Sequence, residues 1–401
     1  MCVGTLEQYT MRAITRHLVA ASIIVAMSVA SVSPSSSAAE TAPLSIEKCQ
    51  LAKYYQQTLS PGFPRDSALI PSTGTIRSLF LYVDFPDNKS SQKNKAFTNQ
   101  YAAGAKKFLE SQSYGRAKFI FDSTEKTFRI NKKSSSYAIT EDGQGDSRGL
   151  IQDAINAADS AIDFAKYDFV TVVPPKDTKT ILFSGALTGG QGMFTSREKE
   201  FSSGIWIGKN KLSNFSQPGS GWSFYAHELG HVLGLMHPYY QRDGGPGAIW
   251  DLMGNGGTSV PEFIGWHRFL LGWFSDSQVS CFSLDSFTKA QVTLSPINTN
   301  SAEKKIVVIT LNAKQAIIVE LRRGSQFDKL LKNEEGILVY RVDVTKGDDE
   351  GIITVLGKKG TKREGQTLES LQKGEKLSYE AITLRVVSSS KSGDVVEISK
   401  G

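Results

Sequence analysis

The spacing of apolar residues along the chain predicts two halves of different architecture. Between residues 75 and 283, runs in which every second residue is apolar alternate with runs of helical period. The strand-like runs are SLFLYVDF, RAKFIFD, YDFVTVVPP and the short GIWIG at 204–208, and the helix-like runs are FTNQYAAGAKKFLESQ, GLIQDAINAADSAID and PEFIGWHRFLLGW. This alternation predicts an α/β unit, and its last helix is expected to begin at Pro261, because proline suits the first turn of a helix.

After Cys281 the pattern changes to short β-branched runs separated by Lys, Gly, Asn and Asp. These runs are AQVTL, KIVVITL, AIIVELR, GILVYRV, GIITVL, AITLRVV and DVVEI. They predict an all-β sandwich over residues 284–401. Residues 40–74 show only weak periodicity, and we expect them to form a short leader or a wrapping segment before the first core strand.

The N-terminus has the features of a secretory signal peptide. Arg12, Arg16 and His17 precede the apolar run LVAASIIVAMSVASV, and small residues follow up to Ala39. A membrane anchor is the alternative, but the run is shorter than the roughly 20 apolar residues that a spanning helix needs. We therefore expect residues 1–39 to be cleaved off, leaving a secreted, extracellular chain without stable membrane insertion.

Removal of that segment would take Cys2 away and leave two cysteines, Cys49 and Cys281. An even number in an oxidising compartment favours a disulfide between them. Two separate thiols are one alternative. Another is Cys49 as a thiolate that blocks a metal in a zymogen, but nothing around KCQLAK supports that role.

Composition narrows the class of protein further. With 40% hydrophobic and 10% aromatic residues, the chain can build packed cores, which excludes a disordered protein. The formal net charge of +6 is modest and dispersed, and no basic stripe is interleaved with aromatic residues. Nucleic acid is therefore not expected as a partner.

The most informative stretch is HELGHVLGLMH at 227–237, which holds three of the five histidines. On a helix, residues four apart share one face, so His227 and His231 can reach the same ion. Gly234 can adopt the left-handed conformation that ends a helix, and the chain can then fold back to bring in His237. Pro238 prevents the helix from resuming at once.

Three imidazoles and a neighbouring glutamate indicate a catalytic zinc site. Zinc accepts neutral imidazole nitrogens in a tetrahedral shell, and three protein ligands leave a fourth position for water. Glu228 points to the side of the ligand face, where it can act as general base. The alternative is an ordinary helix with coincidental histidines, and the third histidine and the turn glycine in register weigh against it.

A glycine-rich turn, WDLMGNGG at 250–257, places Met253 shortly after the third histidine. Filling a gap in the core is the usual role of a methionine. However, H-E-x-x-H-x-x-G-x-x-H followed by such a turn resembles the metzincin peptidases, in which the methionine forms a hydrophobic floor beneath the zinc histidines. The resemblance implies a metzincin-like catalytic domain of α/β (α+β) class with one catalytic Zn²⁺ ion, and Met253 as support rather than ligand.

The resemblance narrows to the immune inhibitor A family of secreted bacterial metallopeptidases. The stretches that carry it are LYVDFPDN, SYGRAKFIF, AIDFAKYDFVTVV, IWDLMGNGG, PEFIGWHRFLLGW and GILVYRVD, in this order. Many members end the zinc motif with aspartate where this chain has His237, so the general metzincin pattern is matched better than the pattern of the family itself.

Calcium is a weaker cofactor candidate. The immune inhibitor A family often carries an acidic, calcium-like insertion after the stretch that reads FAKYD here, but in this chain YDFVTVV runs straight into a strand. The acidic stretch EDGQGD at 141–146 does not have the spacing of an EF-hand loop, and a solvated loop fits it better.

Three further features have two interpretations each. Tyr239 and Tyr240 are candidates for stabilising the oxyanion of a tetrahedral intermediate, although packing positions fit them better. His267 is a candidate for a supporting or transition-state group, although a structural histidine is the simpler interpretation. The run GIWIG precedes the zinc motif, where metzincins have the edge strand that pairs with an extended substrate.

Together these features predict a secreted zinc-dependent endopeptidase that binds a polypeptide substrate in extended form. The alternative is a non-catalytic, zinc-containing surface-binding or adhesion protein. Glu228 and an open fourth position argue against that alternative, because a structural zinc site needs neither. By analogy, the β-domain packs on the catalytic domain or binds substrate or the cell surface. A carbohydrate-binding role would need a row of exposed aromatics, and the sequence does not single one out.

Overall fold

The first half is built on a sheet with strand order β2-β1-β4-β8-β5, to which β3 adds by pairing with β1. The strands are β1 (Gly74–Asp84), β2 (Ala117–Ser123), β3 (Phe128–Arg129), β4 (Phe169–Val173), β5 (Gly185–Thr188) and β8 (Ser203–Trp206). All neighbours are parallel except β5, which runs antiparallel to β8 and forms an edge. Between β5 and β8 in the sequence, β6 (Phe194–Thr195) and β7 (Glu200–Phe201) pair as a small hairpin.

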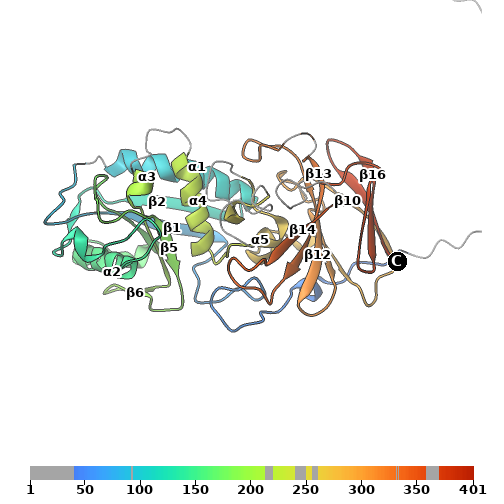
Figure 1. Ribbon diagram of the computed structural model, residues 1–401, viewed down its shortest axis with the longest axis horizontal. Coiled ribbons are helices and arrows are strands. Elements are labelled where there is room, and N and C mark those ends of the chain that lie inside the picture. The colour runs from blue at the N-terminus through green and yellow to red at the C-terminus, as the bar shows by residue number, and fades with distance from the viewer. Residues whose placement is uncertain are drawn as a thin grey trace, which may run out of the picture. The chain divides into compact units, whose positions relative to one another are not determined.

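Helices bury both faces of this sheet, as a largely parallel sheet requires. Side chains alternate along β1, so Phe80 and Tyr82 belong to one core with α1 (Asn94–Gln112) and α4 (Ser220–Val232). Leu79 and Leu81 point the other way, into a core with α2 (Ser147–Ala158). Figure 1 shows α1 and α4 on one side of the sheet and α2 on the other. The metal-motif helix α4 is therefore fixed along its length by the sheet.

The computed structural model describes residues 40–91, 94–212, 220–239, 250–254, 261–330, 332, 334–357 and 370–401. The shorter helices among them are α3 (Lys209–Leu212), α5 (Gly265–Leu270) and the 3₁₀ turns η1 (Ile46–Cys49), η2 (Ser134–Ser136), η3 (Phe164–Lys166), η4 (Leu252–Gly254) and η5 (Asp276–Gln278). Within these residues, none of the helices is both long and apolar enough to cross a membrane.

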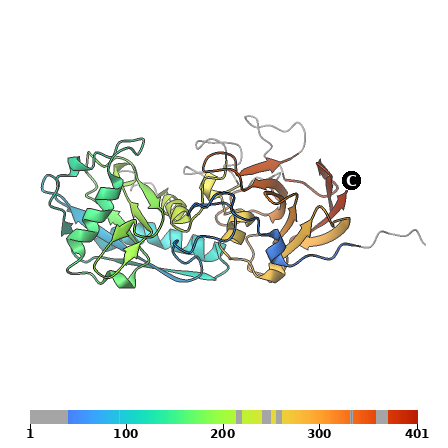
Figure 2. The same ribbon diagram turned by 90° about the horizontal axis from the view of Figure 1, so that it is seen from below.

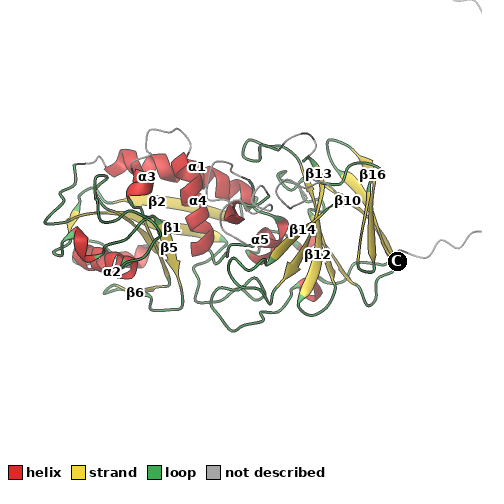
Figure 3. Cartoon of the chain, viewed as in Figure 1, coloured by secondary structure: helices red, strands yellow, loops and turns green. Residues whose placement is uncertain are grey.

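The second half contains two packed sheets whose strand pairs are antiparallel except for one parallel pair, and Figure 3 shows this half as strands joined by loops. Their orders are β14-β13-β12-β11-β9 and β10-β17-β16-β15. The strands are β9 (Val279–Ser283), β10 (Lys289–Leu294), β11 (Ile306–Thr310), β12 (Gln315–Arg322), β13 (Gly336–Asp343), β14 (Ile353–Leu356), β15 (Lys376–Tyr379), β16 (Ile382–Ser389) and β17 (Asp394–Lys400). The described residues thus have a mixed α+β fold, and the expected β-sandwich lies at its C-terminal end.

The five-stranded sheet is buried on both faces, because each face has its own apolar core. On β12, Ile317 and Val319 point into the sandwich. Ala316 and Ile318 point the other way, into a core that also contains Trp266 of α5. The residues that follow Ala38 therefore form one compact unit in which the two halves share a core.

Two boundaries expected from the pattern are wrong. β9 lies before residue 284 but pairs with β11, so the β-rich half begins at Val279. The predicted helix start at Pro261 is also wrong, because α5 begins at Gly265. The backbone N–H groups of Ile264 and Gly265 donate to the carboxylates of Asp251 and Glu320, so distant side chains determine where the helix starts.

The expectation that GIWIG forms the substrate-binding edge is also wrong. Its strand, β8, lies between β4 and β5 and has a hydrogen-bonded neighbour on each side. The edge strand is β5, which comes earlier in the sequence and is inserted outside β8. Order along the chain does not reveal such an insertion.

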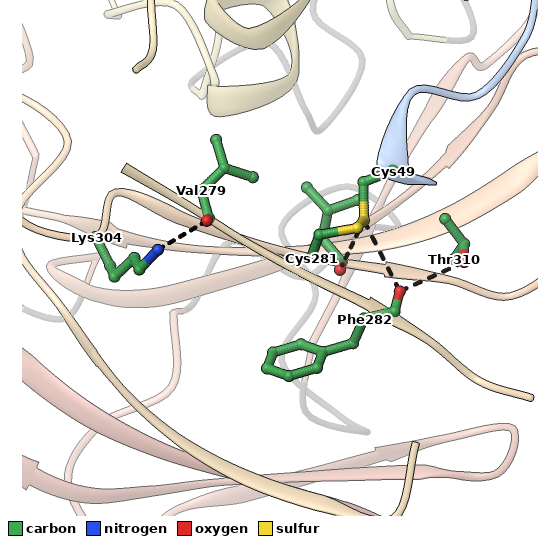
Figure 4. Close-up of a disulfide and its surroundings, with 7 residues drawn as sticks. Cys49, Val279, Cys281, Phe282, Lys304 and Thr310 are labelled. Atoms are coloured by element: carbon green, nitrogen blue, oxygen red, sulfur yellow. Dashed lines mark hydrogen bonds between the residues drawn. A yellow bond between two sulfur atoms is a disulfide. The ribbon is translucent and has the colours of Figure 1, made fainter. Parts of the chain in front are cut away.

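Residues 40–74 wrap along both halves, as Figure 2 shows for the dark-blue segment. Leu44 forms a bridge with Cys281, and the expected disulfide is present between Cys49 and Cys281. Figure 4 shows η1 held against β9 by this bond. Further along, the indole N–H groups of Trp266 and Trp273 donate to the carbonyls of Pro61 and Ser72. The segment is therefore an integral layer of the fold.

Candidate metal centre

Three histidine nitrogens converge on one point. The Nε2 atom of His237 lies 3.3 Å from Nε2 of His227 and 3.2 Å from Nε2 of His231. Zinc–nitrogen bonds of 2.0–2.1 Å at tetrahedral angles place two ligand nitrogens about 3.3 Å apart. These two distances match the edge of a zinc coordination tetrahedron, and because the ligand atoms of all three residues lie within 4.8 Å of one another, they can hold a metal ion.

The opposite nitrogen of each ring is held by a hydrogen bond that selects the tautomer. The Nδ1 partners are the carbonyl of Leu252 (2.8 Å) for His227, the carbonyl of Leu235 (2.9 Å) for His231, and the carboxylate of Asp348 (3.0 Å) for His237. Each partner can only accept, so each Nδ1 must carry the proton. The lone pairs of all three Nε2 atoms then face one another, an arrangement that a cation stabilises.

Burial favours the neutral forms of His227 and His231. It lowers the pKa of His227 to about 4, with the nearby His237 acting in the same direction. Burial likewise lowers the pKa of His231 well below its usual range. At neutral pH both rings therefore offer lone pairs rather than protons, as metal binding requires.

The end of α4 turns the chain so that His237 can return to the site. Gly234 has a φ of 94°, in the left-handed region, and the N–H of Leu235 donates to the carbonyl of Gly230. A Cβ atom on Gly234 would lie 2.5 Å from Leu69 of the N-terminal segment. From the same segment, the Nε of Arg65 donates to the carbonyl of Leu233. Residues 40–74 therefore support the last turn of the metal-motif helix.

The turn η4 supports the site from below. Met253 is fully buried and packs against Gly230, where a Cβ atom would lie only 2.3 Å from the methionine sulfur. Its neighbour Leu252 supplies the carbonyl that orients His227. One short turn thus provides both the packing and the hydrogen bond beneath the first ligand.

Asp251 holds this turn in place. Its carboxylate accepts hydrogen bonds from the backbone N–H groups of Met253 (2.6 Å) and Ile264 (2.9 Å), and from Nδ1 of His267 (2.9 Å). His267 is 3% exposed, and its described contact is with Asp251 rather than with the three ligands. His267 therefore acts as a structural histidine, because it helps to hold Asp251.

Of the two tyrosines considered for stabilising an oxyanion, only Tyr239 lies within the described residues. Tyr239 is buried in the core that contains Trp250 and Trp266, and burial raises its pKa well above the usual value. This is a packing position, and no described contact supports an oxyanion role. Tyr240 lies outside the described residues, so its role stays a prediction.

Glu228 lies on α4 directly after the first ligand and is 7% exposed. The Nζ of Lys211 lies 4.9 Å above the ring of Phe224, one helical turn before Glu228. Burial lowers the pKa of Lys211, and the carboxylate of Glu228 partly offsets this shift. A cation on α3 thus acts electrostatically on the predicted general base.

The acidic stretch 141–146 has a structural role at one end. The side chain of Asp146 caps α2 by accepting a hydrogen bond from the backbone N–H of Gly149 at 2.7 Å. The Oγ1 of Thr140 donates to the carboxylate of Asp142 within the same turn. Two of its carboxylates are thus hydrogen-bonded to neighbouring residues.

Four residues of the site escaped sequence reasoning, namely Gly230, Asp251, Asp348 and Lys211. Gly230 lies inside the motif. Its close packing against the methionine turn could have been predicted, because it is a glycine on the helix face that meets this turn. Asp348 is 111 residues away from His237 in the sequence, and nothing in its local context marks it.

Replacing Gly230 by alanine should destabilise the protein despite the better helix propensity of alanine. The new methyl group would overlap the sulfur of Met253 in a closed core, which costs about 1–3 kcal/mol. The gain in helix propensity is only about 0.5–1 kcal/mol. We expect a lower free energy of unfolding in urea, and a smaller loss than the sum of the single losses when Met253→Ala is added. A Gly230→Ala variant as stable as the wild type would contradict this packing.

A scan against protein-family models found none that matches the chain, and a search of curated proteins found no relative. A functional conclusion therefore rests on the geometry of the site.

Proposed function

We propose that this chain is a secreted, zinc-dependent endopeptidase of the metzincin type, related to the immune inhibitor A family. The observation that carries the proposal is the convergence of three histidines, with Nε2 of His237 lying 3.2–3.3 Å from the Nε2 atoms of the other two, and with a glutamate directly after the first of them in the sequence. The family relationship rests on the sequence stretches named above.

Zinc is the metal that fits this donor set best. Calcium and magnesium prefer oxygen ligands, whereas the three converging atoms are neutral imidazole nitrogens. Among metals that accept imidazole, zinc favours the tetrahedral arrangement that these spacings match. Three protein ligands leave one position open, which is typical of catalytic sites.

Bound at this site, zinc would polarise the scissile carbonyl and make a water molecule more acidic. The carboxylate of Glu228 accepts the proton of the attacking water and then passes it to the leaving amine, so that one side chain acts first as base and then as acid. The carbonyl of Leu252 keeps the ring of His227 oriented throughout.

We place the extended substrate on β5 instead of GIWIG. Among the described residues, β5 has a hydrogen-bonded neighbour only on the side of β8. A polypeptide can add to such an edge as an antiparallel strand, with its backbone providing affinity. The side chains that give specificity then lie in the neighbouring loops.

A chelator experiment tests the proposal. We expect the purified protein to digest casein or gelatin, to lose this activity in 1,10-phenanthroline, and to regain it when zinc is restored. The activity should be insensitive to serine- and cysteine-directed inhibitors, because no covalent intermediate is formed. Inert protein that nevertheless holds one zinc would favour the alternative of a surface-binding or adhesion protein.

A further inference from the structure

The third histidine differs from the other two in how it is held. His227 and His231 are positioned by α4, which packs along its length in the first half. His237 follows the turn after α4, and its described hydrogen-bond partners lie in the segment between β13 and β14. The metal centre is therefore assembled from both halves of the fold.

One carboxylate of that segment contacts His237 twice. Oδ1 of Asp348 accepts the backbone N–H of His237 at 2.5 Å, and Oδ2 lies 3.0 Å from Nδ1 of its ring. The first bond fixes the main chain, and the second fixes the ring and its tautomer. The backbone and the ring of His237 are thus held by the same carboxylate.

The backbone around Asp348 is shaped to reach this position. The N–H of Asp349 donates to the carbonyl of His237 at 3.2 Å, and the N–H of Ile353 donates to the carbonyl of Pro238 at 2.8 Å. Asp349 adopts a left-handed φ of 59°, which aspartate tolerates better than most residues. Both bonds hold the chain at His237 and Pro238 alongside the edge of the β-rich half.

The segment is also held internally. The carboxylate of Glu350 accepts the N–H of Gly347 at 2.7 Å, and that of Asp343 accepts both donors of Thr345. These contacts close the loop without touching His237. Glu350 therefore offers a matched control, as a carboxylate of the same loop with no described contact to a ligand.

We propose that Asp348 is the positioning residue of the third metal ligand, and that the β-rich half is for this reason part of the metal site. This inference rests on the proposed zinc function. A carboxylate behind a ligating imidazole orients the ring and makes its metal-binding nitrogen more basic. Loss of such a partner typically lowers metal affinity about 10–100-fold.

The test measures zinc affinity directly, by competition with a chelating dye, in full-length Asp348→Ala, Asp348→Asn and Glu350→Gln. We expect Asp348→Ala to bind zinc about 10–100-fold more weakly. Asp348→Asn should lose less, because its amide oxygen can still accept one of the two hydrogen bonds. Glu350→Gln should keep the wild-type affinity, which excludes a general effect of charge in the loop.

Two further measurements separate positioning from a structural role. Thermal unfolding of the metal-free variants should match the wild type, because Asp348 lies at the surface, with 42% of its side chain exposed. With Co²⁺ in place of zinc, the visible absorption of Asp348→Asn should differ from that of Glu350→Gln, since it reports ligand geometry.

The outcomes distinguish this inference from the proposed function. If the wild type binds one zinc and both Asp348 variants bind it equally tightly, the inference is overturned and the peptidase proposal stands. If the wild type binds no zinc, the proposed function fails and the inference fails with it. Should Asp348→Ala not fold, Asp348→Asn decides, because its side chain has the same size.

Discussion

Replacing Glu228 by glutamine is expected to lower the rate of peptide hydrolysis by about 10²–10⁴-fold, the usual contribution of a general base. Glutamine has nearly the same size but cannot accept a proton from water at neutral pH. Glu228 is not one of the three converging ligands, so the zinc content should stay at one ion per chain. The measurement compares kcat on a fluorogenic peptide with zinc content by atomic absorption.

Two variants control this experiment. Glu47→Gln removes an exposed carboxylate that is distant from Glu228 in the sequence, and it should leave activity unchanged. His231→Gln should lose both activity and zinc, because it removes one of the converging nitrogens. If Glu228→Gln hydrolyses the peptide at the wild-type rate, Glu228 is not the general base.

Replacing Arg268 by methionine is expected to destabilise the protein by about 3–5 kcal/mol, the usual cost of breaking a buried ion pair. The Arg268 side chain is fully buried. Its guanidinium donates to Glu262, Gln112, the hydroxyl of Tyr114 and the carbonyls of Phe263 and Ile297. These partners come from both halves, so the loss should weaken their joint packing. Urea unfolding followed by tryptophan fluorescence measures it.

A second variant shows whether the lost charge is the cause. In Arg268→Met, the carboxylate of Glu262 would stay 2% exposed without its cation. Adding Glu262→Gln removes that charge, so the double variant should lose less stability than the two single losses added together. An Arg268→Met variant as stable as the wild type would show that the ion pair contributes nothing.

The three converging histidines were predictable because they lie within one short stretch. Helical geometry alone places His227 and His231 on one face, and a glycine at 234 indicates where the chain can turn back. Asp348 could not be predicted, because its proximity to His237 arises only when β13 and β14 are in place. Local spacing thus predicts which histidines come together, and tertiary structure supplies the carboxylate that orients the third of them.

The fold likewise contains some elements that the local sequence predicts and others that it does not. Strands such as β1 and β12 were evident from their long apolar runs, whereas β5 has four half-exposed or small residues and no clear period. The start of α5 was missed because Asp251 and Glu320 satisfy the N–H groups that open the helix. Elements whose ends are determined by distant side chains carry no local signal.

The disulfide also joins two parts of the chain that are made at different times. Cys49 and Cys281 are 232 residues apart in the sequence. At usual rates of synthesis, roughly 10–50 s separate their appearance. Until residues 266–281 have been made, the first segment of the compact unit lacks both its cysteine partner and the tryptophans that it covers. The earliest part of this unit to be made therefore cannot take its place until most of the chain has been made.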